Sequence, residues 1–301
     1  MKDVGKFALA TVTSENYVQW SMVMIYSFLK SNPWFKGDIV VISNDLSEKS
    51  LSVLSIFPSI IIEKPSEMLN QKLGQLCAEL PGFCRLINNF LSVEVFRLNQ
   101  YDKVLFLDSD MVVIKNVQEL FHLPGNLYAS LEWFSGKGRR LSDFKISQQT
   151  GSGDNFIEKP VNTGMMVISG GLLQHHLYQR IIGFIQPEHW KNNTSLLTDQ
   201  LIINKFFNGK FNIIDASYNF RPKNAEGIYK KEKIRLEDAK ILHFMLKAKP
   251  WNLTEVFKTA GHKLDMLKGF EIWYNWYFDF LTWLHLQQKV NILVSNKSRS
   301  V

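Results

Sequence analysis

Short apolar runs rich in β-branched residues alternate along this chain with longer segments of helical periodicity, and this alternation constrains the fold more than any other feature. The runs Phe7 to Val12, Ile39 to Ser43 and Ile60 to Ile62 predict strands, and the segments from Tyr17 to about Lys30 and from Ser47 to Ile56 predict the helices between them. Such a β-α-β-α-β order is typical of an α/β domain with a mainly parallel sheet.

The same alternation continues through the rest of the chain. It predicts a helix from about Phe83 to Leu98, strands at Val104 to Leu107, Met165 to Ser169, Phe211 to Asp215 and Lys240 to Phe244, and helices after Gly171 and from Thr198. Between Phe134 and Pro160 the chain is polar, basic and aperiodic. A long aperiodic stretch inside a compact domain indicates a lid or a binding loop.

Composition excludes several classes of protein. With 301 residues, 46% of them hydrophobic, the chain can bury a sizeable core, so disorder and collagen-like repeats are excluded. The 35 Lys and Arg against 28 Asp and Glu give a formal charge of +7, which favours an anionic partner without distinguishing nucleic acid, lipid headgroup and nucleotide phosphate. Two cysteines, Cys77 and Cys84, are too few for a disulfide framework or a zinc site and favour a reducing compartment.

Signals for export or membrane insertion are not apparent. Thr11, Thr13 and Ser14 interrupt the apolar run near the N-terminus, and no uncharged apolar stretch reaches the roughly 18 residues of a membrane span. We therefore expect a cytoplasmic protein, or one that is peripheral on a membrane.

A pair of acids, Asp108 and Asp110, directly follows the most apolar strand and stands at its carboxyl end, where ligands gather in open α/β sheets. Two carboxylates this close repel each other unless a cation lies near them. The pair therefore suits a hard divalent ion that a substrate diphosphate also contacts. The alternative is a solvated turn with two surface acids.

Four blocks of the sequence, in order, resemble those of glycosyltransferase family 8, the group that includes glycogenin and galactinol synthase. They are YDKVLFLDSDMVVIKNVQELF around the acid pair, Val161 to Val167 for the Phe-Asn-Ser-Gly block, Thr198 to Gln200 with Ile203 and Asn204 for the Asp-Gln block, and His243, Phe244 and Lys249 to Trp251 for the closing metal and phosphate block. The resemblance spans Ala8 to about Trp283.

This resemblance implies an α/β fold of the GT-A glycosyltransferase type, with a Rossmann-like nucleotide-binding mixed sheet, helices on both faces and a helical C-terminal extension. Residues 1–260 would form the glycosyltransferase domain, with a nucleotide-sugar half over about 1–125 and an acceptor half over about 126–260. Residues 261–301 would form an aromatic-rich helical extension and tail.

The resemblance also implies a metal site with Asp108, Asp110 and His243 as its ligands. An imidazole beside two carboxylates favours Mn²⁺ over Mg²⁺, since Mg²⁺ prefers shells of oxygen and water. Considered alone, His243 is more typical of a hydrogen-bonded core histidine than of a ligand. Lys249 would contact the diphosphate and stabilise the leaving nucleotide, and its alternative is a solvated surface lysine.

Donor and sugar contacts follow from the same blocks. Thr11, Thr13 and Tyr17 would hold the nucleotide base, with the Tyr17 ring available for stacking, and Ser109 would bind the donor with the acid pair. Without the resemblance, Tyr17 would be a core residue of a helix.

Asn162, Asp199 and Gln200 would surround the transferred sugar as the catalytic group, and Asp154 in the polar loop would meet the sugar or the acceptor. Asp199 also has a structural interpretation, as a first-turn acid that stabilises its own helix with Thr198 as the cap.

Several positions depart from the family pattern. Ser92 stands where a lysine is expected before the acid pair, with Arg97 nearby as a substitute cation, and the Lys137 to Lys145 loop adds further positive charge. Leu246 replaces a glycine that would allow close approach to phosphate, and Leu196 replaces an acid that glycogenin-like members carry. These changes weaken a claim of glycogenin-like activity but leave the metal ligands in place.

The stretch from Gly269 to Leu293 is dense in aromatic residues at spacings near three and four, which predicts a closing helix packed on the domain. The alternative is a membrane-surface helix, because the aromatics lie near Lys289, Lys297 and Arg299.

By resemblance, the chain transfers a hexose, glucose or galactose, from a UDP-sugar to a hydroxyl with retention of configuration and Mn²⁺ or Mg²⁺ as cofactor. The acceptor would be a glycan, a protein or a lipid-linked sugar, and a homodimer is compatible with the sequence. Alternatives are a lipopolysaccharide or surface-glycan hexosyltransferase and a non-catalytic nucleotide-sugar-binding homologue. A nucleic-acid ligand has only the net charge in its favour, and we expect none.

Overall fold

The computed structural model describes residues 5–132, 160–191, 198–245, 247, 249–260 and 263–298. Asp154 and the polar loop, apart from Pro160, lie outside these residues, as do Leu196 and Leu246.

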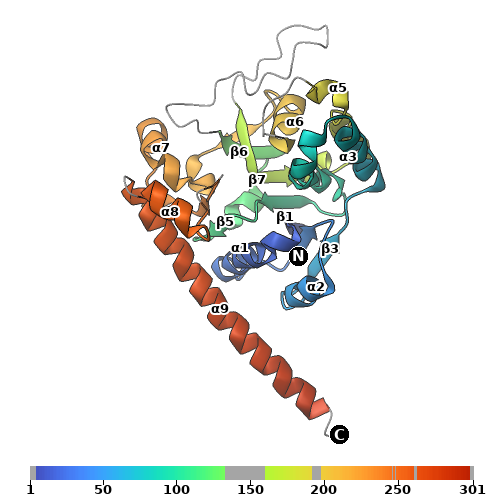
Figure 1. Cartoon of the computed structure of the whole chain (residues 1–301). Coiled ribbons are helices and arrows are strands. Elements are labelled where there is room, and N and C mark those ends of the chain that lie inside the picture. Colours follow the sequence, from blue (N-terminus) through green and yellow to red (C-terminus); the bar gives the residue numbers. More distant parts are fainter. Residues whose placement is uncertain are drawn as a thin grey trace.

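A seven-stranded sheet with the order β3-β2-β1-β4-β7-β6-β8 forms the centre of the molecule (Figure 1). Its strands are β1 (Phe7–Val12), β2 (Asp38–Ile42), β3 (Ile60–Glu63), β4 (Lys103–Leu107), β6 (Leu127–Leu131), β7 (Val161–Ser169) and β8 (Asn212–Ile214). The first four are mutually parallel, β7 runs antiparallel to β4 and β6, and β8 is parallel to β6. The expected α/β class with a mixed, largely parallel sheet is therefore confirmed.

A second, two-stranded sheet pairs β5 (Met111–Val113) with β9 (Ile241–His243) in antiparallel register. Met111 lies opposite His243, although the two residues are far apart in the sequence. This pairing brings the histidine of the closing block next to the acid pair that precedes β5.

Helices cover both faces of the central sheet. They are α1 (Val18–Ser31), α2 (Glu48–Leu54), α3 (Glu67–Glu79), α4 (His175–Ile182), α5 (Pro187–Trp190), α6 (Asp199–Phe206), α7 (Ala225–Glu232), α8 (Leu253–Ala260) and α9 (Leu264–Ser298). Turns of 3₁₀ helix add η1 (Glu15–Tyr17), η2 (Pro81–Arg97), η3 (Gln118–His122), η5 (Gly170–Leu172), η6 (Ala216–Asn219), η7 (Pro222–Asn224) and η8 (Leu236–Asp238).

Alternate residues of each strand point to opposite faces, and so the sheet separates two apolar cores. Leu9 packs with α1, α2 and the start of α9, whereas Ala8 and Ala10 pack with α3, η2, α4 and α6. Helix starts are capped where the sequence provides serine: the Ser47 and Ser66 hydroxyls accept hydrogen bonds from the Ser50 and Leu69 amides, at 3.2 and 3.1 Å.

The segment expected as a helix from Phe83 to Leu98 is helical, but it is wound as the 3₁₀ helix η2. Its last two turns pack on all sides, since every residue from Phe90 to Phe96 is buried. A segment enclosed in this way shows no clear amphipathic period, so the sequence pattern does not distinguish the tighter winding.

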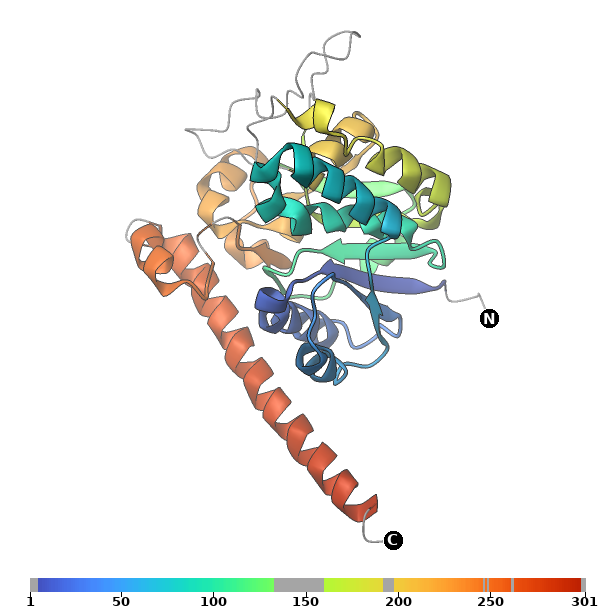
Figure 2. The ribbon, with the colours of Figure 1, turned by 45° about the vertical axis from the view of Figure 1, so that its right-hand side comes forward.

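Helix α9 has 35 residues and is therefore about 52 Å long. Its first half packs on the domain through the buried Phe270, Trp273 and Phe280, and its C-terminal half extends beyond the domain (Figures 1 and 2). The predicted closing helix is thus present along its whole length, and its first half packs on the domain as expected. No helix among the described residues is both long enough and apolar enough to cross a membrane.

Candidate active site

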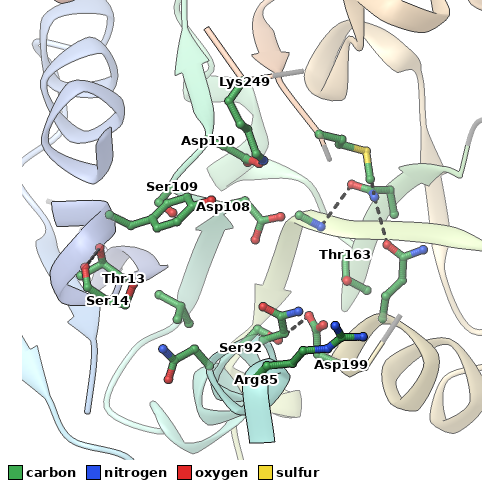
Figure 3. Close-up of a pocket in the computed structure, with 18 residues that line it drawn as sticks. Thr13, Ser14, Arg85, Ser92, Asp108, Ser109, Asp110, Thr163, Asp199 and Lys249 are labelled. Atoms are coloured by element: carbon green, nitrogen blue, oxygen red, sulfur yellow. Dashed lines mark hydrogen bonds and ion pairs between the residues drawn. The ribbon is translucent and has the colours of Figure 1, made fainter. Parts of the chain in front are cut away.

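A cavity of about 410 Å³ opens at the carboxyl ends of β1 and β4 (Figure 3). Its walls come from the turn after β1, one face of η2, the acid pair, the start of β7, the start of α6 and the segment after β9. Of the residues predicted for the site, the cavity is lined by Thr13, Tyr17, Asp108, Ser109, Asp110, Asn162, Asp199, Gln200 and Lys249.

Asp108, Asp110 and His243 form a cluster whose candidate ligand atoms all lie within 4.8 Å of one another. The His243 Nε2 lies 3.1 Å from Asp110 Oδ1 and 3.6 Å from Asp108 Oδ2. On the other side of the ring, Nδ1 lies 2.8 Å from Asn219 Oδ1, and because that oxygen can only accept, we assign the ring proton to Nδ1.

With that tautomer, the Nε2 lone pair faces two carboxylates, an arrangement that needs a cation. Adjacent ligands of a six-coordinate ion with bonds of about 2.1 Å are about 3 Å apart, close to the distance between Nε2 and Asp110 Oδ1. Asp110 Oδ1 is also buried without a hydrogen-bond partner. The donor set of two carboxylates and one imidazole thus fits a divalent transition metal such as Mn²⁺.

The surroundings of the cluster shift the pKa values of Asp108 and Asp110 in opposite directions. Burial would raise the pKa of Asp110, but Lys249, which forms an ion pair with Asp110 Oδ2, outweighs burial and holds that pKa well below its usual value. The Asp108 side chain opens into the cavity. Loss of hydration at this site and, to a lesser extent, repulsion from the Asp110 carboxylate hold the pKa of Asp108 well above its usual value.

Gly164 lies directly behind the cluster. A Cβ atom at this position would lie 2.5 Å from Asp108 Oδ2 and 2.6 Å from His243 Cε1, closer than carbon can approach either atom. The glycine in the Asn-Thr-Gly run of β7 therefore makes room for the metal ligands. Sequence reasoning placed Gly164 in a family block but gave it no role.

On the opposite side of the cavity, Asp199 accepts a hydrogen bond from the Ser92 hydroxyl at 2.7 Å. Burial raises the pKa of Asp199, and the hydrogen bonds lower it less than burial raises it. Thr198 stands at the N-cap of α6 with Asp199 in the first turn, as predicted, but the Thr198 hydroxyl caps no amide and instead donates to the Asp199 carboxylate at 3.2 Å.

A buried polar network links Asn162 and Gln200 to His243 of the acid-histidine cluster. Asn162 accepts a hydrogen bond from Asn219 at 2.8 Å and donates to Gln200 at 3.0 Å and to Glu132 at 2.9 Å. Glu132 in turn forms a buried ion pair with Arg221. Asn219, Glu132 and Arg221 were not identified from the sequence, because none of them lies in a motif.

The predicted base-binding residues differ in their placement. Tyr17 lines the cavity and meets the Trp251 ring edge-on at 5.9 Å, and Trp251 itself stacks on Trp20 at 4.5 Å. The Thr13 hydroxyl accepts a hydrogen bond from Ser21 at 2.7 Å. Thr11 is fully buried and is not among the lining residues, so the structure does not bring it to the cavity as predicted.

The expectation that Arg97 substitutes for the missing lysine is wrong. Arg97 bonds Glu94 at 2.7 Å and Glu63 at 3.4 Å, and it does not line the cavity. The Ser92 hydroxyl donates its hydrogen bond to Asp199. The cation of this helix that lines the cavity is Arg85 and not Arg97.

This fold, with its metal-type cluster at the strand ends, is that of a GT-A glycosyltransferase. Residues 8–255 match the sequence profile of Glycosyl transferase family 8, and the chain belongs to that family.

Similar proteins agree with this assignment. The structure resembles that of the galactosyltransferase LgtC in complex with donor and acceptor sugar analogues, with a TM-score of 0.67, 19% identity and coverage of 90% of this chain and 95% of that chain. It also resembles the glycosyltransferase GlyE of Streptococcus pneumoniae TIGR4, with a TM-score of 0.61, 20% identity and coverage of 93% and 63%.

In sequence, the chain is 28% identical over 186 residues to galactinol synthase 2 of Arabidopsis thaliana, covering 55% of this chain and 51% of that protein. It is 23% identical over 269 residues to glycogenin-1 of Caenorhabditis elegans, covering 84% and 52%. The match thus spans about half the length of each of these relatives. It spans 94% of the uncharacterized protein R707 of Acanthamoeba polyphaga mimivirus, at 22% identity.

Proposed function

We propose that this protein is a metal-dependent, retaining hexosyltransferase that moves glucose or galactose from a UDP-sugar to a hydroxyl of a glycan, protein or lipid-linked acceptor. The observation that carries the proposal is the cluster of Asp108, Asp110 and His243 with Lys249 at the mouth of one cavity. Its relatives named as galactinol synthase, glycogenin and LgtC support a hexose as the transferred group.

The diphosphate end of the donor would lie at this cluster. Asp108, Asp110 and His243 would hold Mn²⁺ or Mg²⁺, which when bound would act as a Lewis acid on the diphosphate. Lys249 brings a second positive charge to the same side of the cavity, and Asp110 and the Trp251 ring, 6.0 Å from its Nζ, hold it there. Lys249 would stabilise the negative charge that develops on the departing UDP. Thr13, Tyr17 and Ser109 would contact the nucleotide.

The hexosyl group would lie between Asp108 and the start of α6. Asn162 and Gln200, held in place by Glu132, would fix its hydroxyls, and Asp199 would accept hydrogen bonds from them. In the transfer step, the bond between the anomeric carbon and the diphosphate oxygen breaks, and a bond to the acceptor oxygen forms on the same face. The acceptor's proton passes to the departing diphosphate oxygen, so no covalent enzyme intermediate is required.

Release of UDP tests the proposal. The protein is incubated with Mn²⁺ and a panel of UDP-sugars, and we expect UDP release from UDP-glucose or UDP-galactose that is lost when Asp110→Ala removes a ligand. The matched control is Asp265→Ala on α9, which is remote from the cavity and should leave the rate unchanged. Binding of UDP-sugar without any UDP release would instead identify a non-catalytic homologue, and an equal rate in Asp110→Ala would exclude the metal site.

A further inference from the structure

The cavity is lined by two cationic side chains among the described residues, Lys249 and Arg85, and they are in different states. Lys249 is paired with Asp110. The exposed Arg85 has no hydrogen bond or ion pair to any part of the chain that the structure describes. A guanidinium that faces a ligand cavity with its donors unused is available to a ligand.

One face of η2 presents Arg85 to the cavity. Arg85, Asn88, Asn89 and Ser92 recur at intervals of three and four residues, and all four line the cavity. Ser92 anchors this face to Asp199 through its 2.7 Å hydrogen bond. In Figure 3, Arg85 lies beside Asp199 on the side of the cavity away from Lys249 and Asp110, with Asp108 between the two sides.

Charge also favours a ligand role for Arg85. Three carboxylates line the cavity, at Asp108, Asp110 and Asp199, against the single ammonium of Lys249. Lys249 and the candidate metal ligands lie on one side of the cavity, and Asp199 lies on the other (Figure 3). Arg85 is the one cation among the described lining residues that lies on the Asp199 side.

We infer that Arg85 binds the hexosyl end of the donor, beside Ser92, where the described lining residues include no other cation. The inference rests on the proposed function. The guanidinium would donate hydrogen bonds to hydroxyl oxygens of the hexose while Asp199 accepts hydrogen bonds from its hydroxyls, so that a donor and an acceptor side chain face the same sugar. Arg85 is thereby a determinant of affinity for the sugar and not for the nucleotide.

Comparing UDP-hexose with UDP separates this role from others. Titration calorimetry with Mn²⁺ should show that Arg85→Ala weakens the binding of UDP-glucose or UDP-galactose about ten-fold or more, the scale of a lost hydrogen bond from a charged group. The same variant should bind UDP within about two-fold of wild type. Arg85→Lys should recover part of the loss, because it restores the charge without the planar pair of donors.

Two further variants act as controls. Lys249→Ala should weaken UDP and UDP-hexose alike, because it removes a cation from the diphosphate side. Lys210→Ala removes an exposed lysine that is remote from the cavity and should change neither affinity. Because Arg85 is exposed and has no partner among the described residues, Arg85→Ala should also keep the wild-type melting temperature.

The outcomes distinguish the inference from the proposed function. If wild type binds neither UDP nor any UDP-hexose, the proposed function fails. If wild type binds both but Arg85→Ala changes neither affinity, or weakens both equally, then the proposed function stands and the inference about Arg85 is overturned. Equal weakening would mean that Arg85 acts through the overall charge of the cavity or through Asp199.

Discussion

Single atoms decide whether the proposed metal ligands of this protein can lie together. At Gly164 the backbone of β7 passes so close to Asp108 and His243 that there is no space for a side chain. At Asn219 one amide oxygen orients the imidazole, and such a second partner fixes both the tautomer and the ring plane of a ligand histidine. The motif residues therefore depend on neighbours that carry no charge.

The first prediction is at this scale. Gly164→Ala should lower the affinity for Mn²⁺ by at least about ten-fold, because the new methyl group displaces Asp108 Oδ2 or the His243 ring, and changes that misplace ligands cost about that much. Isothermal titration with Mn²⁺ measures the effect.

The matched control for this prediction is Gly74→Ala in α3, where a Cβ would meet nothing within 4 Å. This change should leave Mn²⁺ affinity unaltered and stabilise the helix slightly. Unchanged Mn²⁺ binding in Gly164→Ala would show that the cluster is not the metal site.

At the scale of elements, the end of β6 is tied to the segment between η6 and η7 by the buried pair of Glu132 and Arg221. Each side chain is only 4% exposed. Glu132 accepts hydrogen bonds from Asn162 and Gln200, so the geometry of the proposed sugar-binding residues depends on contacts between elements that are far apart in the sequence.

This pair predicts a pH dependence of stability. Burial would raise the pKa of Glu132, but Arg221 and the amide donors outweigh burial and lower that pKa below its ordinary 4.5. The carboxylate therefore stabilises the folded state at pH values above about 4.5, and this contribution is lost as the pH falls through the lower pKa of the folded state.

Denaturant unfolding of wild type and Glu132→Gln at several pH values measures this contribution. At pH 7 the variant should be less stable by about 3 kcal/mol or more, because Arg221 remains buried without its partner. The difference should narrow as the pH falls below 4.5. A difference that is the same at pH 7 and pH 3.5 would contradict the assignment.

At the scale of the whole molecule, α9 packs against both the first helix, α1, and the closing block. Trp273 of this helix is 2% exposed and packs against Trp20 of α1 and Trp251 of the closing block, with ring centroids 5.6 and 5.7 Å apart. The same Trp251 meets Tyr17 at the edge of the cavity. Packing of α9 therefore supports the wall of the site as well as the core.

Trp273→Ala should lower the free energy of unfolding by about 3 to 5 kcal/mol, as expected for removing a large buried aromatic side chain. Chemical denaturation followed by circular dichroism measures this. Phe278→Ala, on the same helix, removes a ring that is 61% exposed and should cost far less. Equal losses in the two variants would indicate that α9 does not pack on the domain as described.

Local patterns determined much of this protein. β1 and the neighbouring parallel strands lie within a residue or two of their predicted bounds, because apolar β-branched runs encode strands locally. The pair of Asp108 and Asp110 stands at a strand end as its sequence context indicated. By contrast, the 3₁₀ winding of η2 was not predictable, because a segment that is buried on all sides has no clear amphipathic period in its sequence.

Only the tertiary structure decided which side chains meet. The pairing of β5 with β9 brings His243 to the acids, and packing assigns Arg97 to Glu94 and leaves Arg85 to the cavity. Both arginines lie in the segment that forms η2, and their local sequence does not indicate which of them faces the cavity. The physical reason is that periodicity reports which face of an element is apolar, whereas charge partners depend on elements brought together from distant parts of the chain.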